Sequence, residues 1–299
     1  GARFAISGRI SPGELVAFYG YAAFLVMPLT TATETVHKLT RALVACRRVI
    51  DVLRIEPEIA EPAEPVSPPS DSPLVDVESG LRVEPGALTV VVAARPADGA
   101  LLADRLGRYV DGDVRWGGVR LSDVPVAEVR HRIVVNHTES QLFTGTLRDE
   151  LDVTGRAPRS RILAAIHTAS AGDVLDALPD GFDAEVEERG RSFSGGQRQR
   201  LVLTRALVAD PEVLVLVEPT SAVDAHTEAR IARRLRGARD GRTTVVVSTS
   251  PLVLEHADRV AFVVDGHVAA EGTHRGLLAG SAAYRRVVTR DEDEEGAVV

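Results

Sequence analysis

Hydrophobic and polar positions divide the chain into an apolar N-terminal stretch and a longer part in which short apolar runs alternate with amphipathic ones. The stretch Leu15–Thr33 contains no charged residue. Because an α-helix rises about 1.5 Å per residue, a helix over this stretch nearly spans a hydrocarbon core of about 30 Å. Apolar residues continue at roughly helical spacing to Leu53, so we expect the helix to extend beyond the membrane, with a kink at Pro28.

Basic residues follow the apolar stretch, and an excess of lysine and arginine beside a membrane span favours the cytoplasmic side. The alternative is a buried or interfacial helix of a soluble protein, since the stretch is of marginal length and contains glycine and threonine. The basic residues are Lys38, Arg41, Arg47, Arg48 and Arg54.

A proline- and glutamate-rich segment, residues 56–73, follows this helix and is typical of an extended, semi-rigid linker. Beyond it, apolar runs predict strands that alternate with helical patterns. This alternation favours an α/β fold with a mainly parallel sheet covered on both faces. The predicted strands are Ala87–Ala93, Arg130–Asn136, Glu212–Val217, Thr243–Thr249 and Arg259–Val264, and the predicted helices are Ala100–Tyr109, most of Thr146–Leu178, Ala225–Leu235 and Leu252–His256.

Composition narrows the possible functions only slightly. The 299 residues carry a formal net charge of −8, which argues against a nucleic-acid surface. A single cysteine, Cys46, excludes an internal disulfide framework and fits a reducing compartment. Residues 291–299 form an acidic tail, and the first residue is glycine, so we expect a processed or truncated chain.

The sequence SFSGGQRQR at Ser192–Arg200 opens an apolar run and predicts the start of a helix. Ser194 is a candidate N-cap, and Gly195 and Gly196 allow the backbone to approach a ligand closely. The free N–H groups and the positive dipole end of such a helix favour a phosphate. Because glycine-rich helix starts are common, this stretch alone is weak evidence.

The order of the motifs is more specific. The predicted strand Glu212–Val217 runs directly into Glu218–Asp224, and this order resembles the ATP-binding cassette of ABC transporters, in which a signature helix precedes the Walker B strand and the D-loop. Arg132–Thr146 resembles the family's Q-loop region, and Glu188–Gly190 resembles a segment of exporter cassettes. Thr243–Ser250 resembles one of its closing strands.

This resemblance implies a P-loop NTPase-like cassette over residues 74–290, with an inserted helical subdomain at about residues 146–205. Residues 1–55 then look like the last transmembrane helix of an exporter half-transporter and its cytoplasmic extension. Such a half-transporter normally has several further membrane helices, which this sequence lacks. The implied location is the inner or cytoplasmic membrane, with the cassette in the cytoplasm.

The P-loop position is occupied by Ala93–Leu101, and the residues there differ from the family's pattern. A working P-loop needs glycines, a lysine on the β- and γ-phosphates and a hydroxyl on Mg²⁺. Counting along the resemblance, Ala93 opens the loop, Gly99 stands at the lysine position, and Ala100 and Leu101 stand at the hydroxyl positions.

Two further residues of this loop disfavour phosphate. Pro96 removes a backbone N–H from the expected cradle, and Asp98 adds a negative charge facing the phosphates. Arg95 could replace the lysine, although its spacing does not support that role.

Other positions of the nucleotide site are also altered. By resemblance, Val217 takes the place of the Walker B aspartate that ligates Mg²⁺, while Glu218 keeps the catalytic-glutamate position without a metal to act with. Thr138 aligns with the Q-loop glutamine and Thr249 with the switch histidine. The histidines share no metal-ligand spacing, so we expect no metal site made by this chain.

The features that are kept act across a dimer in this family. They are the signature residues Ser194, Gly195, Gly196 and Gln197 and the D-loop residues Ser221 and Asp224. The resemblance therefore implies the degenerate half of a heterodimeric exporter, in which ATP and Mg²⁺ are held mainly by a partner half-transporter with intact Walker motifs. We expect hydrolysis from the pair and none from this chain alone, with the lipid bilayer as the other partner.

Two alternatives stay open. In the first, the chain is a self-sufficient ATPase with a divergent P-loop, in which Arg95 and Glu218 carry the chemistry. In the second, it is a non-transporting interaction or regulatory module, or an inactive remnant.

Overall fold

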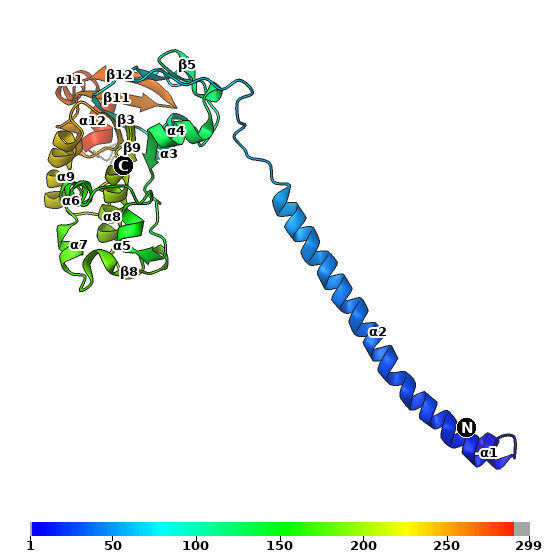
Figure 1. The fold of residues 1–299 in the computed structure, drawn as a ribbon. Helices are drawn as coiled ribbons and strands as arrows, with labels where there is room; N and C mark the ends of the chain where they lie inside the picture. Colours follow the sequence, from blue (N-terminus) through cyan, green and yellow to red (C-terminus); the bar gives the residue numbers. More distant parts are fainter. Residues whose placement is uncertain (1, 290–299) are drawn as a thin grey trace, which may run out of the picture. The chain divides into compact units, whose positions relative to one another are not determined.

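The protein was analysed as a computed structural model that describes residues 2–289 (Figure 1). The chain divides between Pro57 and Glu58 into two compact units, an N-terminal helical unit and a larger α/β unit.

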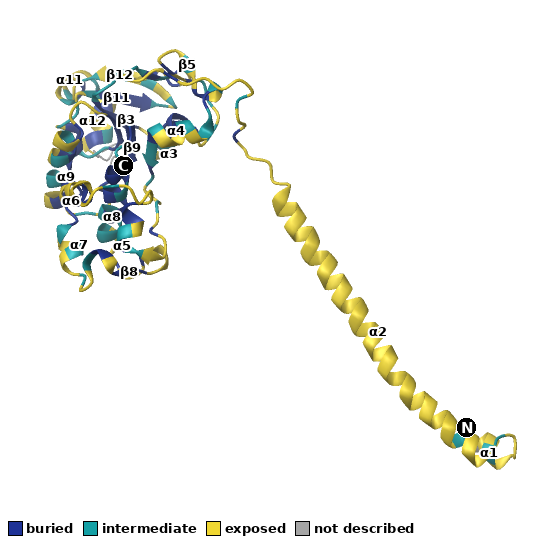
Figure 2. Ribbon diagram, in the orientation of Figure 1, coloured by how far each residue is buried: buried dark blue, intermediate teal, exposed yellow. Residues whose placement is uncertain are grey.

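The N-terminal unit consists of a short helix, α1 (Ala2–Ile6), and a long helix, α2 (Pro12–Leu53). Ser11 begins α2 with a capping box: Glu14 N donates to Ser11 Oγ over 3.2 Å, and Ser11 N donates to the Glu14 carboxylate over 2.7 Å. No described residue of α2 is buried, as Figure 2 shows along its whole length. By length and composition α2 can cross a membrane, as the apolar stretch predicted.

The larger unit is built on a six-stranded sheet in the order β12-β11-β3-β10-β9-β6. All neighbouring strands pair in parallel except the antiparallel edge strand β12, which confirms the predicted mainly parallel α/β fold. Every residue of the central strands β3, β9 and β10 is buried, as expected for strands covered on both faces. The strands are β3 (Leu88–Ala93), β6 (Ile133–Asn136), β9 (Val213–Val217), β10 (Thr243–Val247), β11 (Arg259–Val264) and β12 (His267–Gly272).

Alternate residues of the central strands serve two different hydrophobic cores. Val90 and Leu214 belong to a core that also includes residues of helices on one face of the sheet, whereas Val91 and Val215 belong to a second core. The first core takes in α8 (Gly195–Val208), α9 (Ala225–Ala238), α10 (Pro251–Leu254), α11 (His274–Gly280) and α12 (Ala282–Thr289), and the second takes in α3 (Pro96–Leu106) and α4 (Val126–Arg132).

A second, antiparallel sheet in the order β2-β1-β4-β5 was not predicted from the sequence. It contributes Leu74, Leu81 and Trp116 to the second core. A buried ion pair between Arg105 of α3 and Asp76 of β1, 2.7 Å between nitrogen and oxygen, joins it to the helix after β3. Its elements are β1 (Leu74–Asp76), β2 (Leu81–Val83), β4 (Val114–Trp116), β5 (Val119–Arg120) and the 3₁₀ turn η1 (Leu121–Asp123).

The segment between β6 and β9 contains several short elements before α8. The predicted helical stretch Thr146–Leu178 is broken into three helices, and the breaks lie near Pro158 and Gly172. The elements are β7 (Gly145–Thr146), α5 (Leu147–Leu151), α6 (Arg159–Thr168), α7 (Gly172–Asp176), η2 (Gly181–Asp183), β8 (Glu185–Val186) and η3 (Glu188–Gly190).

Several predicted boundaries were wrong. The helix expected at Ala100–Tyr109 is α3 and begins at Pro96, because proline at the first helical position has its φ angle already set for a helix. Residues 130–132 end α4 instead of beginning strand β6. The helix expected at Ala225–Leu235 continues to Ala238, and the helix expected at Leu252–His256 is the shorter α10.

Residues 58–73, here called the strap, lie against the α/β unit. Val66 N donates to the Asp123 carbonyl over 2.9 Å, and Arg132 Nη1 donates to the Pro68 carbonyl over 2.9 Å. Arg108 Nη2 donates to the Ala60 carbonyl over 2.6 Å. The strap thus belongs to the compact unit that begins at Glu58. The predicted acidic tail, residues 291–299, lies outside the described residues.

Candidate functional site

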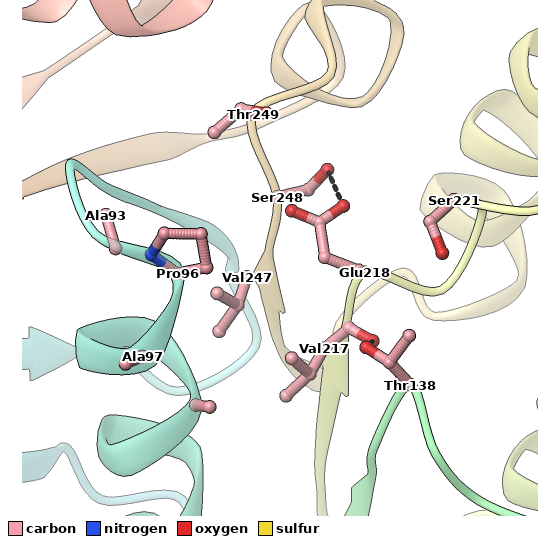
Figure 3. A pocket seen from close by; sticks show the side chains of 11 residues that line it. Ala93, Pro96, Ala97, Thr138, Val217, Glu218, Ser221, Val247, Ser248 and Thr249 are labelled. Carbon is pink, nitrogen blue, oxygen red and sulfur yellow. Dashed lines mark hydrogen bonds between the residues drawn. The ribbon is translucent and has the colours of Figure 1, made fainter.

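A pocket of about 480 Å³ opens at the carboxyl ends of β3, β9 and β10 (Figure 3). Parallel α/β sheets commonly bind ligands at this edge, because the loops that follow the strands meet there. The pocket gathers residues from separate parts of the chain, and its lining is Ala93, Pro96, Ala97, Ala100, Thr138, Val217, Glu218, Ser221, Val247, Ser248 and Thr249.

The turn between β3 and α3 brings a helix to an early start at the place expected for a P-loop. Helix α3 begins at Pro96, directly after its N-cap Arg95, which makes no side-chain capping hydrogen bond. Gly99 consequently lies inside α3 and is buried. A Cβ atom at Gly99 would lie 2.5 Å from Val247 Cγ1 and 3.3 Å from Ala93 Cβ. A lysine therefore does not fit at this position unless its neighbours move.

Asp98 connects this turn by a hydrogen bond to the hairpin between β11 and β12. Its carboxylate accepts hydrogen bonds from Gly266 N, over 3.2 Å, and from Arg95 Nε, over 3.1 Å. Arg95 also forms an ion pair with Asp265 at 3.3 Å. The hydrogen bond to Asp98 raises the pKa of Arg95 above its usual value. Arg95 is thus engaged by two carboxylates, and neither Arg95 nor Asp98 lines the pocket.

The end of β9 supplies the polar side of the pocket. Thr138 Oγ1 donates to the Val217 carbonyl over 3.1 Å, and Ser248 Oγ donates to Glu218 Oε2 over 3.2 Å (Figure 3). Glu218 has a φ angle of +46°, a left-handed conformation that is costly for a residue with a side chain. Thr249 follows β10 and lines the same pocket. Strand ends thus bring Thr138, Val217, Glu218 and Thr249 together.

These residues do not fit a Mg²⁺-bound triphosphate. Among the described residues, no lysine, arginine or histidine lines the pocket, and Glu218 supplies the one carboxylate. Pro96 has no N–H to offer a phosphate oxygen. Within residues 2–289 no group of three or more histidine, cysteine, aspartate or glutamate side chains could hold a metal ion. The apolar and hydroxyl-bearing walls offer no compensation for the charge of the phosphates.

The signature residues form a separate, exposed surface at the start of α8. Ser194 caps the helix with a full capping box, in which Gln197 N donates to Ser194 Oγ over 3.3 Å and Ser194 N donates to Gln197 Oε1 over 2.8 Å. Ser194 and Gly195 are exposed, whereas Phe193 is buried in the core and anchors the turn. The capped end leaves backbone N–H groups of the first turn facing outward.

The segment after β9 contains the D-loop positions Ser221 and Asp224. Ser221 lines the pocket, and Asp224 caps α9 by accepting a hydrogen bond from Thr227 N over 2.9 Å. That backbone hydrogen bond lowers the pKa of Asp224 below its usual value. Of the P-loop positions, Ala93, Pro96, Ala97 and Ala100 line the pocket, whereas Gly99 is buried and Leu101 is 45% exposed elsewhere on α3.

Sequence analysis missed two polar residues of this region, Ser248 and Gln199. Ser248 lay within a predicted strand, and Gln199 lies on α8 just beyond the signature. The sequence held one signal for Gln199. Two glutamines, Gln197 and Gln199, lie two positions apart on a helix whose later residues are mostly apolar.

Comparisons with known proteins agree with this architecture. The family described as ABC transporter matches residues 101–221. A probable multidrug resistance ABC transporter ATP-binding/permease protein of Bacillus subtilis is 29% identical over 98% of this chain and 53% of its own length. An ATP-dependent lipid A-core flippase of Alkalilimnicola ehrlichii is 30% identical over 92% of this chain and 50% of its own length.

A solved structure extends the comparison to the fold. A bacterial Atm1-family ABC exporter with ATP bound superposes with a TM-score of 0.78 at 25% identity and covers 93% of this chain and 52% of the exporter chain. The chain thus spans about half the length of the relatives it matches.

An open α/β sheet with a pocket at its carboxyl edge and a capped glycine pair on an adjacent helix defines a nucleotide-binding cassette. The chain contains an ABC transporter ATP-binding domain preceded by one apolar helix, and its homologues are half-transporter exporters. Its relatives are ATP-binding/permease proteins and exporters. An ABC transporter ATP-binding domain implies binding of ATP with Mg²⁺.

Proposed function

We propose that this chain is the degenerate cassette subunit of a heterodimeric ABC exporter. It supplies Ser194, Gly195, Gly196 and Gln197 to an ATP and Mg²⁺ site held mainly by a partner half-transporter with intact Walker motifs. Helix α2 anchors the chain in the inner or cytoplasmic membrane, and the cassette lies in the cytoplasm. The formal charge of −8 disfavours a nucleic-acid partner.

One contrast carries this proposal. Among the described residues, the chain's own pocket is lined by no cationic side chain and by one carboxylate, whereas the signature turn has a capping box, two glycines and an exposed Ser194 and Gly195. A surface of this kind is useful only to a nucleotide that another subunit holds. The relatives named as an ATP-binding/permease protein, a flippase and an exporter support a role in ATP-driven export.

ATPase measurements on the purified chain, alone and together with an ABC half-transporter that has intact Walker motifs, test the proposal. The chain alone should be inactive, and the pair should hydrolyse ATP. Ser194→Arg or Gly195→Asp in this chain should reduce the activity of the pair about a hundredfold or more, since an electrostatic contact to the transferred phosphate is lost. Glu218→Gln is the control and should leave that activity unchanged.

The alternatives give different results. A self-sufficient ATPase would hydrolyse ATP alone and lose that activity on Glu218→Gln, although Arg95 is already engaged by Asp98 and Asp265. An interaction or regulatory module would leave the activity of the pair insensitive to both signature substitutions.

A further inference from the structure

Gln199 connects the signature helix to the segment that follows β9. Its amide oxygen accepts a hydrogen bond from Ala222 N over 2.8 Å. Its amide nitrogen donates to the Glu218 carbonyl over 2.9 Å and to Ser221 Oγ over 3.0 Å. One half-buried side chain therefore makes three hydrogen bonds to a stretch of five residues.

That stretch does not belong to a helix or a strand and depends on such bonds for its shape. Glu218 lies in the left-handed region, a conformation that persists only where the surroundings fix it. Ser221 N donates to the Glu218 carbonyl over 3.3 Å, so this carbonyl receives two donors, one from its own turn and one from Gln199.

The first turn of α8 contacts the same stretch through Gly196. A Cβ atom at Gly196 would lie 2.7 Å from the Ala222 carbonyl oxygen, so the two backbones touch. Gly196 and Gln199 are three residues apart and share one face of the helix. On this face Gly196 lies close to the Ala222 carbonyl oxygen, and Gln199 accepts the hydrogen bond from the Ala222 N–H.

We propose that Gln199 is a positioning residue that holds Glu218–Ala222 against the signature helix. Glu218 and Ser221, which line the pocket, then move together with the signature surface that is offered to a partner. The structural part of this proposal concerns the isolated chain, and its catalytic consequence rests on the function proposed above.

Hydrogen exchange at the Ala222 amide tests the structural part without any partner. Gln199→Met keeps the length of the side chain and its helix propensity but removes all three hydrogen bonds. It should speed exchange at Ala222 about tenfold, because the N–H loses its acceptor. Gln199→Glu keeps an oxygen acceptor for Ala222 N and should preserve most of the protection, even if the methionine variant is poorly folded.

The control is Gln141→Met, a change at an exposed glutamine whose side chain makes no hydrogen bond within the described residues. This variant should exchange at Ala222 as the wild type does. Unchanged exchange in Gln199→Met, or equal loss of protection in Gln199→Met and Gln199→Glu, would overturn the proposal.

The catalytic consequence is measured on the pair with a half-transporter that has intact Walker motifs. Gln199→Met should raise the KM for ATP and lower kcat, together reducing kcat/KM about tenfold, because a displaced signature binds and orients phosphate less well. Ser194→Arg is measured in parallel. If Ser194→Arg has no effect, the proposed function fails while the exchange result still decides the role of Gln199. If Ser194→Arg inactivates the pair and Gln199→Met leaves KM and kcat unchanged, the positioning role is wrong.

Discussion

At the scale of single residues, Gly99 shows why one substitution cannot place a lysine side chain beside the chain's own pocket. The early start of α3 at Pro96 draws the Gly99 position into the helix, next to Val247 and Ala93. Only hydrogen fits at the Cβ position, because the nearest side-chain atom would be 2.5 Å away. The backbone at Gly99 therefore does not accommodate a lysine side chain unless its neighbours move.

Gly99→Lys should therefore fail to create ATP binding and should lower the free energy of unfolding by about 1–3 kcal/mol, the usual cost of overpacking a core. Urea unfolding and binding titrations with Mg-ATP measure the two effects. Leu101→Lys, on the exposed side of the same helix, is the matched control and should change stability little. Tight ATP binding by the Gly99→Lys variant would contradict this account of the turn.

His274 and Tyr284 form a second residue-scale feature, far along the chain from the signature. His274 Nδ1 lies 2.8 Å from the Tyr284 hydroxyl, and the Tyr284 ring packs edge-on against Phe262 with 5.5 Å between ring centroids. Burial lowers the pKa of His274 below 6.5, and burial raises the pKa of Tyr284 to about 12. The folded state therefore prefers a neutral His274 hydrogen-bonded to a protonated tyrosine.

A lowered histidine pKa means that the folded chain binds fewer protons than the unfolded chain near pH 6. The contribution of His274 to stability should be present above pH 6.5 and lost as the pH falls through the lowered folded-state pKa. His274→Gln removes the titration and keeps a partner for the Tyr284 hydroxyl. Urea unfolding at pH 5.5 and 7.5 should show a smaller difference for the variant than for the wild type, and equal differences would be evidence against this coupling.

At the scale of elements, the strap is a proline-rich segment that arginine side chains hold against the α/β unit. Arg132 donates to the Pro68 carbonyl, forms an ion pair with Glu212 at 2.8 Å and stacks on Trp116 with 4.2 Å to the ring centroid. The prolines keep the strap extended, and hydrogen bonds along its length fix its course on the α/β unit.

Arg132→Ala should release the strap and cost about 2 kcal/mol, since several hydrogen bonds to a charged group are lost together. The amide of Val66, bonded to the Asp123 carbonyl, should exchange faster in this variant. Arg130→Ala is the control on the same helix, because Arg130 contacts Tyr109 and the Arg108 carbonyl. Unaltered exchange at Val66 in Arg132→Ala would show that Arg132 does not hold the strap.

The central sheet could be predicted because β3, β9 and β10 are uncharged runs made mostly of valine and leucine with some threonine, as expected for strands buried on both faces. The antiparallel sheet could not, since β1, β2, β4 and β5 have two or three residues each, too few to show a period of two. Patterns of this length occur by chance in any loop.

The candidate site was predictable in part for a similar reason. Val217 and Thr249 end predicted strands, and Thr138 and Glu218 follow predicted strands, so parallel pairing places all four at one edge. The roles of Gln199 and Gly99 depend on atoms far away in sequence, the Ala222 amide and the Val247 side chain. Neither the capping chemistry nor the hydrophobic pattern carries information about such contacts.

At the scale of the whole molecule, the α/β unit contains both hydrophobic cores, and neither core includes a residue of the N-terminal unit among the described residues. Each unit is therefore stabilised by a different environment. The α/β unit is stabilised by its own apolar interior, whereas the apolar surface of α2 has no protein cover in the described residues.

Residues 58–299 should consequently fold without residues 1–57 and unfold in one cooperative thermal transition, followed by circular dichroism. The full chain should stay with membranes after an alkaline carbonate wash, and the shortened chain should be released. Leu25→Lys should weaken membrane retention of the full chain, as a lysine at the centre of a span costs about 3 kcal/mol. Release of the unaltered full chain by carbonate would refute the membrane role of α2.

The early start of α3 also bears on how a subunit with the proposed function could evolve. Under that proposal, a catalytic centre at this edge would need a later helix start and room beside Val247, because a Cβ atom at Gly99 would lie 2.5 Å from Val247 Cγ1. Each such change alone disturbs a packed interior. We therefore expect natural variation to accumulate more readily at the exposed start of α8 than at this buried turn.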